Sequence, residues 1–366
     1  MRGIVAGCSV APMLLNQLEP RLHRAYQAGP LMATFLPWFE FAVCAIAIGL
    51  AGPVLTQYGD IIARLTGLSR SWIGLVLLAT ATSLPELFTG LSSVTVARVP
   101  NIAVGDALGS CVFNLVMLVL LDEMSRTEPM YRRIDQGHVL TAGFGIILIG
   151  TVGAIVLIGR GALSVQFLHI SIYTPLLILL YLVAMRAAFT YERRTQPPPQ
   201  MIEMEPAITL AGALLRYATA AAVIVAAAIW LPFAGAQIAD TMGWQTSFVG
   251  TLLIAAATSV PELVVSISAF RLRAVDMAIG NLLGSNLFDV LVLAIDDLAY
   301  RDGPLLSSVS PVHAISAFAA VVMSGIFVVA MLYKPETRIR GTVGWVSISL
   351  LAVYLFSAYT VYLHGH

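Results

Sequence analysis

The sequence carries little charge. Only 11% of its 366 residues are Asp, Glu, Lys or Arg, whereas an ordinary globular chain contains roughly 25%. A water-soluble surface cannot be assembled from so few charges, and 58% of the residues are hydrophobic. Apolar runs of about 20 residues, the length that crosses a bilayer, recur along almost the whole chain. The composition therefore predicts a protein that lies mostly within a membrane.

Cysteine is also scarce. Cys8, Cys44 and Cys111 are too few and too scattered for a disulfide framework or a zinc site, and we interpret them as packing residues. The residues ending at Cys8 resemble a lipoprotein cleavage box. That interpretation is disfavoured, because only one Arg and a very short apolar stretch precede it.

Alternating polarity is missing from apolar stretches such as 146–158, although a membrane barrel would show it in segments of about ten residues. We therefore predict an all-α membrane protein with ten transmembrane helices. The predicted spans are 34–57, 72–97, 101–122, 136–158, 167–190, 208–233, 247–270, 275–299, 311–333 and 341–363.

The ten spans divide into five and five at a proline-rich loop that is too short for a folded domain. The residues before the first span are interrupted by Arg21, Arg24 and Pro30. They fit either a cleavable signal or a mis-assigned start. We predict four segments: an extension of unknown role at 1–33, a first five-helix repeat at 34–190, a short cytoplasmic linker at 191–206, and a second five-helix repeat at 207–366.

The basic residues predict an orientation. Of the 20 Arg and Lys residues, six fall in loops on the side of the N-terminus, so the positive-inside rule puts both termini outside the cytoplasm. Arg is strongly preferred, with Lys334 the only lysine, and alanine is abundant. Both features are typical of GC-rich prokaryotic genomes. They predict a multi-pass protein of the cell membrane, plasma or inner.

The two halves repeat each other. Residues 67–86 read GLSRSWIGLVLLATATSLPE and residues 243–262 read GWQTSFVGTLLIAAATSVPE; GDALGSCVFN at 105–114 is matched by GNLLGSNLFD at 280–289. Each half holds an odd number of spans, so the second half enters the bilayer from the opposite face. Inverted repeats of this kind are a recurrent transporter design, with the substrate site at their interface.

Each repeat places a glutamate, Glu86 or Glu262, deep in an apolar span. An ionised carboxylate costs several kcal/mol there unless it is compensated, and a bound cation compensates it. The structural alternative is a protonated glutamate that bonds across helices. Two glutamates at equivalent repeat positions favour a cation site over that alternative.

Other oxygen donors follow the same helix faces, since residues three, four and seven apart are neighbours on a helix. Pro85 and Pro261 kink the two motif helices and free backbone carbonyls. Gly105, Gly109, Gly280 and Gly284 allow close helix approach, either as plain packing or as part of a packed ion site. The oxygen donors predicted beside the glutamates are Thr82, Ser83, Ser110 and Asn114 in the first half, and Thr258, Ser259, Ser285 and Asp289 in the second. Ala79 and Ala255 lie on the same helix faces as the two glutamates.

An all-oxygen site with carboxylates suits hard cations such as Ca²⁺ and Na⁺. The histidines His138, His169 and His313 lie outside both motif blocks, and we interpret them as loop or packing residues. The site has three carboxylates, so moving it empty through an apolar barrier is penalised, and that penalty favours exchange. We predict Ca²⁺, Na⁺ and the lipid bilayer as partners, with no cofactor, no nucleic acid and no obligatory protein partner.

At these motifs the sequence resembles the sodium/calcium exchanger family of the calcium/cation antiporters, because the two blocks look like its two alpha repeats. The layout of five plus five spans, which is similar to that of the family, covers nearly the whole chain after the extension. The resemblance implies that the residues named above line the ion sites, with the backbone carbonyls of Ala79 and Ala255 among the ligands. It also implies that the first and sixth helices slide to alternate access, with Pro53 and Pro232 near their ends.

Departures from the family pattern affect the details. Ala81 and Ala257 stand where the family usually has Gly, and Asp106 and Cys111 stand where Asn is expected. Their counterparts in the second half are Asn281 and Asn286. Asp106 either adds a fourth carboxylate near the site or caps a helix start.

We predict a secondary active antiporter that exchanges Na⁺ for Ca²⁺. The alternative is a Ca²⁺/H⁺ or other cation/H⁺ antiporter on the same fold. The proton-coupled branch typically carries Gly-Asn-X-X-Glu, whereas this chain has Ser83 and Ser259 at the Asn position, which favours sodium. An enzyme is disfavoured because no His-Glu-X-X-His or Gly-X-Ser-X-Gly motif occurs, and a channel because no polar pore stripe is evident.

Overall fold

The computed structural model describes residues 30–65, 79–125, 130–132, 134–158, 166–167, 170–195, 208–271, 273–335 and 344–365. Over these residues the chain is almost entirely helical, which confirms the all-α class. The elements are α2 (Pro30–Leu65), α4 (Ala79–Thr82), α5 (Leu84–Thr95), α6 (Pro100–Met124), η2 (Met130–Arg132), α7 (Gly137–Ile158), β1 (Gln166–Phe167), β2 (Ile170–Ser171), α8 (Tyr173–Thr195), α9 (Leu210–Met242), α10 (Thr246–Phe248), η3 (Val249–Ile254), α11 (Ala255–Thr258), α12 (Val260–Arg271), α13 (Val275–Ala299), α14 (Leu305–Ser308), α15 (His313–Tyr333) and α16 (Trp345–His364).

The membrane spans follow the predicted series. Within the described residues, eight helices are long and apolar enough to cross a membrane, and a ninth span consists of two helical pieces, Thr246–Thr258 and Val260–Arg271, bent by 42°. The predicted span 72–97 corresponds to α4 and α5, and its earlier part lies outside the described residues. The protein is therefore a multi-pass membrane protein.

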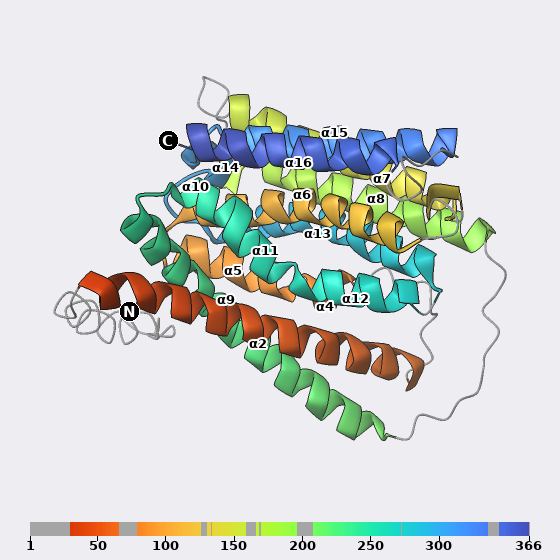
Figure 1. Cartoon of the computed structure of the whole chain (residues 1–366), viewed down its shortest axis with the longest axis horizontal. Coiled ribbons are helices and arrows are strands. Elements are labelled where there is room, and N and C mark those ends of the chain that lie inside the picture. Colours follow the sequence, from red (N-terminus) through yellow and green to blue (C-terminus); the bar gives the residue numbers. More distant parts are fainter. Residues whose placement is uncertain are drawn as a thin grey trace, which may run out of the picture.

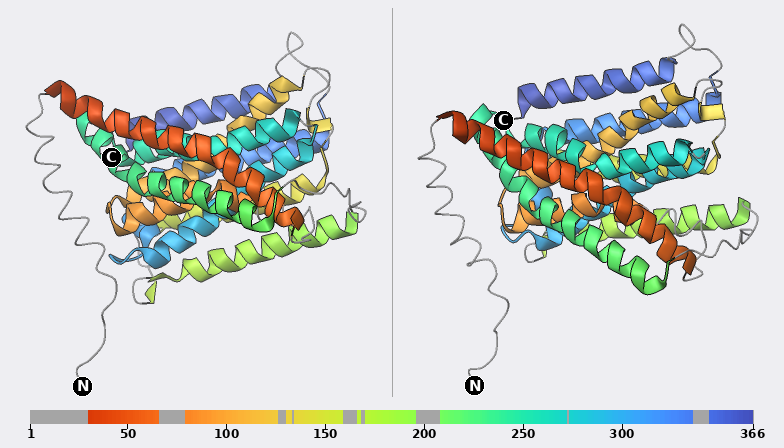
Figure 2. Two further views of the ribbon diagram at one scale, coloured as in Figure 1. Left: turned by 90° about the horizontal axis from the view of Figure 1, so that it is seen from below. Right: turned by 60° about the horizontal axis from the view of Figure 1, so that its bottom comes forward.

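The first and sixth helices are longer than predicted. The 36 residues of α2 correspond to about 54 Å of helix, well beyond the roughly 30 Å of a hydrocarbon core, and α2 and α9 run obliquely (Figure 2). Pro53 and Pro232 lie inside these helices, so the expectation that they lie near the helix ends is wrong. Membrane helices continue past proline because neighbouring groups can satisfy the freed backbone.

The fifth span begins later than predicted. Strands β1 and β2 form a short antiparallel pair in which Phe167 is opposite Ile170, and α8 starts only at Tyr173. The reason is polar anchoring, since Asp297 accepts hydrogen bonds from the Ser171 backbone N–H at 3.0 Å and from Thr174 Oγ1. These bonds hold the chain in an extended turn before the helix.

Helices α6 and α13 form the centre of the bundle, with α15 and α16 on one side and α2 and α9 on the other (Figure 1). Nearly all of α6 and α13 is buried. The outer helices expose large apolar side chains instead, including Phe35, Leu50, Leu179 and Phe356. Because apolar side chains outside and polar ones inside suit a lipid environment, the polar site lies in the middle of the bundle.

Helices α2 and α9 lie side by side and run in opposite directions (Figures 1 and 2), as inverted repeats require. The start of α2 meets the start of α10 through Trp38 and Trp244, whose ring centroids are 6.1 Å apart. Ser247 donates to the Gly365 carbonyl at 2.9 Å. The beginning of the first helix and the end of the last therefore lie at the same end of the bundle.

Two buried aspartates 175 positions apart make matching cross-repeat bonds. Asp122, at the end of α6, accepts from the Met130 N–H at 3.2 Å and from the Ser347 hydroxyl of α16 at 2.9 Å. Asp297, at the end of α13, accepts from the Leu305 N–H at 2.7 Å as well as from the start of α8. The repeat relationship thus extends beyond the two motif blocks, and each half anchors the last helix of the other.

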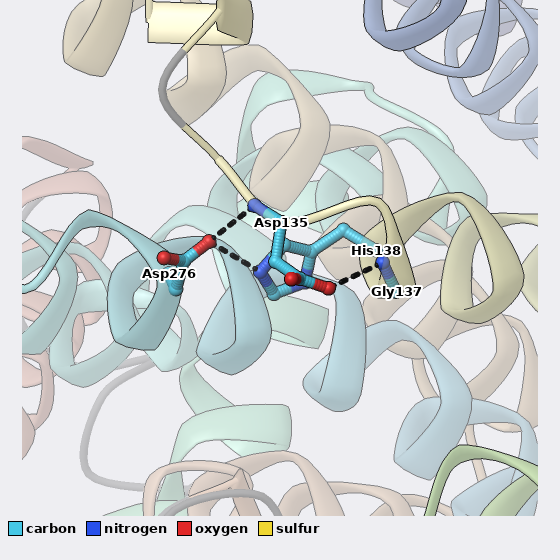
Figure 3. Close-up of polar contacts among 4 residues, drawn as sticks. All are labelled: Asp135, Gly137, His138 and Asp276. Carbon is cyan, nitrogen blue, oxygen red and sulfur yellow. Dashed lines mark hydrogen bonds and ion pairs between the residues drawn. The ribbon is translucent and has the colours of Figure 1, made fainter. Parts of the chain in front are cut away.

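A polar joint, defined here as the contact of Asp276 with Asp135 and His138, ties the two repeats at one end of the bundle (Figure 3). Asp276 Oδ1, in the first turn of α13, accepts from the Asp135 backbone N–H at 2.7 Å and lies 3.2 Å from His138 Nε2. Asp135 Oδ1 in turn accepts from the Gly137 N–H at 2.7 Å. This polar joint connects the beginnings of α7 and α13.

The opposite end carries an equivalent joint built on an amide. Asn101 Oδ1, in the first turn of α6, accepts from the Ser310 backbone N–H at 2.8 Å and lies 3.1 Å from His313 Nε2. These three residues are the counterparts of Asp276, Asp135 and His138 at the repeat offset of 175 positions. Two of the histidines that the sequence marked as loop or packing residues thus connect the repeats.

Candidate cation site

Both motif helices break at the motif serine. Ser83 separates α4 from α5 with φ −88° and ψ 12°, and Ser259 separates α11 from α12 with φ −81° and ψ 7°. A proline follows two positions later in each case, and its missing N–H removes one helical hydrogen bond. The same local sequence therefore produces the same break, in opposite directions, in the two halves.

The breaks bring the two motifs together. Ser83 Oγ donates to Glu262 Oε1 at 3.2 Å, and Ser259 Oγ donates to Glu86 Oε1 at 3.4 Å. Both glutamates are buried, with at most 1% of their surface exposed. Each carboxylate is thus held by the motif serine of the other repeat.

The serines of α6 and α13 complete this pattern. Ser110 lies 3.5 Å from Glu86 Oε1 and Ser285 lies 3.4 Å from Glu262 Oε1. The hydroxyl oxygens of Ser259 and Ser110 are 3.0 Å apart. All four serine contacts with the two glutamates use Oε1. The Oε2 atom of each glutamate is buried and has no hydrogen-bond partner.

The motif threonines contact α6 and α13. Thr82 Oγ1 lies 3.4 Å from Asn281 Oδ1, and Thr258 Oγ1 donates to Asp106 Oδ1 at 2.8 Å. Asp106 is in the second turn of α6, which begins at Pro100. It therefore does not cap the helix start, and the alternative in which it lies beside the motif residues fits the structure.

Asn114 and Asp289 lie at equivalent positions but have different neighbours. Asn114 Nδ2 donates to Asn286 Oδ1 at 3.0 Å, and Asn286 Nδ2 donates to the Cys111 carbonyl at 3.2 Å. Cys111 Sγ lies 3.6 Å from Asp289 Oδ2. The interpretation of Cys111 as a packing residue is therefore incomplete, because its thiol contacts a carboxylate of the candidate site.

The two alanines differ in what the structure describes. Ala255 is the first residue of α11, and its carbonyl accepts from the Ser259 N–H at 3.0 Å and lies 3.3 Å from Thr258 Oγ1. The predicted carbonyl ligand is therefore engaged within its own helix. Ala79 begins α4, and its side chain lies outside the described residues.

The glycines of α6 allow a close contact with the π-helical turn η3. A Cβ atom at Gly109 would lie 2.3 Å from the Thr251 carbonyl oxygen, and one at Gly105 would lie 3.0 Å from the Thr251 nitrogen. At Gly280 the nearest atom is 3.7 Å away, on His138, so no tight packing occurs there. The contacts of Gly284 lie outside what the structure describes.

Several buried oxygens of the site have no partner. All are carboxylate or amide oxygens located where the two repeats meet. They are Glu86 Oε2, Asp106 Oδ2, Asn114 Oδ1, Glu262 Oε2 and Asp289 Oδ1. Within the described residues no three acidic, histidine or cysteine side chains are close enough to hold one metal ion. Hydroxyl and amide oxygens would therefore have to complete the coordination of a hard cation.

The sequence did not identify Asn281, Asn286 and Cys111 as members of the site. The available signal was the repeat alignment, which pairs Asn281 with Asp106 and Asn286 with Cys111. Since both members of each pair lie on the same helix face as a predicted ligand, the contacts follow once the helices are packed.

Buried oxygen donors at the meeting point of two inverted helical repeats define a secondary transporter of hard cations. The model of the sodium/calcium exchanger protein family matches residues 36–215 and 212–363. The chain belongs to this family. Its members are antiporters, and cation antiport involving Ca²⁺ is the activity that the family and fold support.

Relatives and solved structures agree with this assignment. The inner membrane protein YrbG of Escherichia coli is 26% identical over 320 residues, covering 79% of this chain and 97% of its own. The putative antiporter CaxA of Alkalimonas amylolytica is 26% identical, covering 63% and 70%. A structure of the sodium-calcium exchanger NCX_Mj soaked with Na⁺ and Sr²⁺ covers 89% of this chain and 99% of its own, with 21% identity and a TM-score of 0.59, and this likeness shows the shared fold.

Proposed function

We propose that this protein exchanges Na⁺ for Ca²⁺ by alternating access, with the ions bound between the two motif breaks. The observation that carries the proposal is the reciprocal pairing of Ser83 with Glu262 and of Ser259 with Glu86. This pairing aims the hydroxyls at Oε1 and leaves each buried Oε2 without a partner. Both halves thereby offer a carboxylate oxygen to a cation.

The charges explain why ions would be exchanged. Glu86, Glu262 and Asp289 supply three negative charges, and Asp106 adds a fourth. Ca²⁺ or several Na⁺ ions reduce this charge, whereas an empty site would carry desolvated carboxylates across the barrier at a cost of several kcal/mol. Bound ions therefore accompany each change of access.

We assign the moving part to α2 and α9. These two helices pack on each other at one side of the bundle, and a Cβ atom at Gly52 of α2 would lie 2.6 Å from the Pro261 side chain. Thr89 and Ser92 of α5 donate to the Ala228 and Ile229 carbonyls of α9 at 3.4 and 2.6 Å. Sliding of α2 would move Gly52 against Pro261, next to the α11–α12 break. Sliding of α9 would move its contacts with α5, the helix that follows the other break.

The proposed location is the cell membrane, in line with the inner-membrane description of the Escherichia coli relative. The excess of Arg in the loops that follow α2, α6 and α8 supports an orientation in which the start of α2 and the end of α16 lie outside the cytoplasm. A cysteine introduced at exposed Asp240, near the end of α9, should react with a membrane-impermeant thiol reagent added outside intact cells. Protection until the cells are opened would contradict this orientation.

The deciding experiment uses purified protein in sealed liposomes. Uptake of radioactive Ca²⁺ is measured with an outward Na⁺ gradient, with an outward H⁺ gradient and with neither. We expect uptake only with the Na⁺ gradient, and its loss in Glu86→Gln. Asp240→Asn, which removes an exposed carboxylate from α9, serves as the control and should transport normally.

The second candidate is Ca²⁺/H⁺ exchange, which Asp106 favours. Its Oδ2 is buried without a partner beside the site, and a carboxylate in that position can carry a proton. Uptake driven by the H⁺ gradient alone would replace the sodium proposal with this one. Uptake that needs no gradient would indicate a channel and contradict both.

A further inference from the structure

Adjacent aspartates near the end of α13 have opposite surroundings. Asp297 accepts hydrogen bonds from Leu305, Ser171 and Thr174, so its oxygens are satisfied. Asp296 is fully buried, yet neither of its carboxylate oxygens has a hydrogen-bond partner. Asp297 is therefore a structural residue, and Asp296 needs another explanation.

Asp296 lies against the helix that carries Glu86. A Cβ atom at Gly90 would lie 2.3 Å from Asp296 Oδ2, so the carboxylate touches α5 where that helix has no side chain. Gly90 is four residues after Glu86 and Asp296 is seven after Asp289, which corresponds to about 6 Å and about 10 Å along the two helices. The Asp296 carboxylate therefore lies beyond Glu86 along α5 and beyond Asp289 along α13, toward the end of the bundle where both helices finish.

The contact exists in one half only. At the repeat offsets, the counterpart of Asp296 is Leu121 and the counterpart of Gly90 is Ser266. Ser266 receives a hydrogen bond from Asn281 Nδ2 at 3.3 Å, so its position is filled by a polar side chain. The acid on α13 fits against α5 only because residue 90 is a glycine, since a Cβ atom there would clash with the carboxylate.

A bound proton alone does not satisfy Asp296. The neutral carboxyl would still present an O–H that requires an acceptor, and an ionised carboxylate left unpaired in an apolar surrounding costs several kcal/mol. A cation supplies the missing charge and occupies the carboxylate oxygens. The single carboxylate of Asp296 balances one positive charge, which is the charge of a monovalent ion.

We propose that Asp296, packed against Gly90, binds a monovalent cation at an outer station between the central site and the end of the bundle at which α13 finishes. In the proposed exchange cycle this cation is Na⁺, and that assignment rests on the proposed function. Ser93, buried and one turn beyond Gly90 on α5, offers a hydroxyl oxygen on the same side. The station would hold a Na⁺ ion as it enters or leaves the central ligands.

The test measures binding of radioactive Na⁺ to the purified protein at equilibrium, and then the Na⁺ dependence of Ca²⁺ uptake. Asp296→Asn should bind one Na⁺ fewer per chain than the wild type and should need about tenfold more Na⁺ for half-maximal exchange, the change expected for loss of one charge-assisted contact. Its Ca²⁺ affinity should be unchanged. Asp240→Asn is the matched control, because it removes an exposed acid and should alter neither quantity.

Gly90→Ala provides a second variant that keeps the carboxylate. Its added Cβ displaces Asp296, so its Na⁺ affinity should fall in the same direction, and elution as a single species on size exclusion checks folding. Equal Na⁺ stoichiometry and equal Na⁺ dependence in Asp296→Asn and wild type would overturn the proposal. The proposal would also be overturned if Asp296→Asn lost bound Ca²⁺ and kept its Na⁺. It would be overturned as well if Asp296→Asn bound Na⁺ normally and changed only the pH dependence of Ca²⁺ uptake. A wild type that binds Na⁺ at Asp296 but does not exchange it would contradict the proposed function and leave the station in place.

Discussion

The two repeats make the same contacts where they hold the glutamates, but carry different side chains at several positions of α6 and α13 beside them. The exchanged serine contacts, Ser83 with Glu262 and Ser259 with Glu86, have lengths of 3.2 and 3.4 Å. By contrast, Asn114 corresponds to Asp289 and Asp106 to Asn281. The serine–glutamate contacts are thus symmetric, whereas the carboxylates beside them are distributed unequally between the two halves.

The two joints at the ends of the bundle also carry groups of different charge at equivalent positions. One is built on the half-exposed carboxylate of Asp276 and a histidine that is 14% exposed. The other is built on the amide of Asn101 and on His313, which is fully buried. The inverted repeat supplies the same backbone contact twice, and the local exposure determines which polar group is tolerated, because an unpaired charge is far more costly inside than at the surface.

The largest expected effect tests the symmetric core. Glu86→Gln and Glu262→Gln should each reduce Na⁺-driven Ca²⁺ uptake by at least about 30-fold, since removing one charged ligand from a buried contact costs roughly 2–5 kcal/mol. The two losses should be similar, because the contacts are reciprocal. A variant that retains full uptake would remove its glutamate from the site, and a large difference between the two would break the symmetry.

The next largest effect tests the difference in charge between Asn114 and Asp289. Asp289→Asn should lower Ca²⁺ affinity by about tenfold or more, because it makes the two halves alike and removes one of the charges that attract the ion. Adding Asn114→Asp to that variant should restore part of the affinity by moving the carboxylate to the equivalent position. The measurement is the Ca²⁺ concentration for half-maximal uptake. If the double variant had the same Ca²⁺ affinity as Asp289→Asn, the position of the carboxylate, and not the total charge, would determine the affinity.

A smaller effect is expected from the serines. Ser83→Ala and Ser259→Ala each remove one hydroxyl donor worth about 0.5–1.5 kcal/mol, so uptake should fall about threefold to tenfold. Both variants should bind Ca²⁺ with similarly reduced affinity in equilibrium measurements. An unchanged Ser83→Ala beside an inactive Ser259→Ala would mean that the 3.0 Å contact of Ser259 with Ser110 dominates.

The smallest effects compare the two joints. Asn101→Ala leaves the Ser310 N–H and His313 without their acceptor in a largely buried place, and should lower the free energy of unfolding by about 1–3 kcal/mol. Asp276→Ala breaks a joint exposed to solvent and should cost about 1 kcal/mol or less. Thermal unfolding of the detergent-solubilised protein measures both, and the reverse order would contradict the assignment of the buried joint as the stronger one.

Much of this arrangement could be predicted from local sequence. Proline two residues after Ser83 and Ser259 indicated a break, and the odd number of spans in each half indicated inversion. The lengths of α2 and α9 were underestimated because the spans were placed from apolar runs of about the length that crosses a bilayer. Both helices continue well past Pro53 and Pro232. The late start of α8 was missed because it depends on Asp297, which is more than a hundred residues away in the chain.

The sequence by itself determined the membrane class, the inverted repeat and the pair of intramembrane glutamates, because hydrophobic length, repeat register and the cost of a buried charge all act within short stretches of chain. Only the tertiary structure decided which serine serves which glutamate, that Cys111 and Asn286 lie beside Asp289 and Asn114, and that Asp296 is left without a partner while Asp297 has three. Those outcomes depend on contacts between residues far apart in the chain, and hydrogen bonds of a few ångströms are set by how whole helices pack.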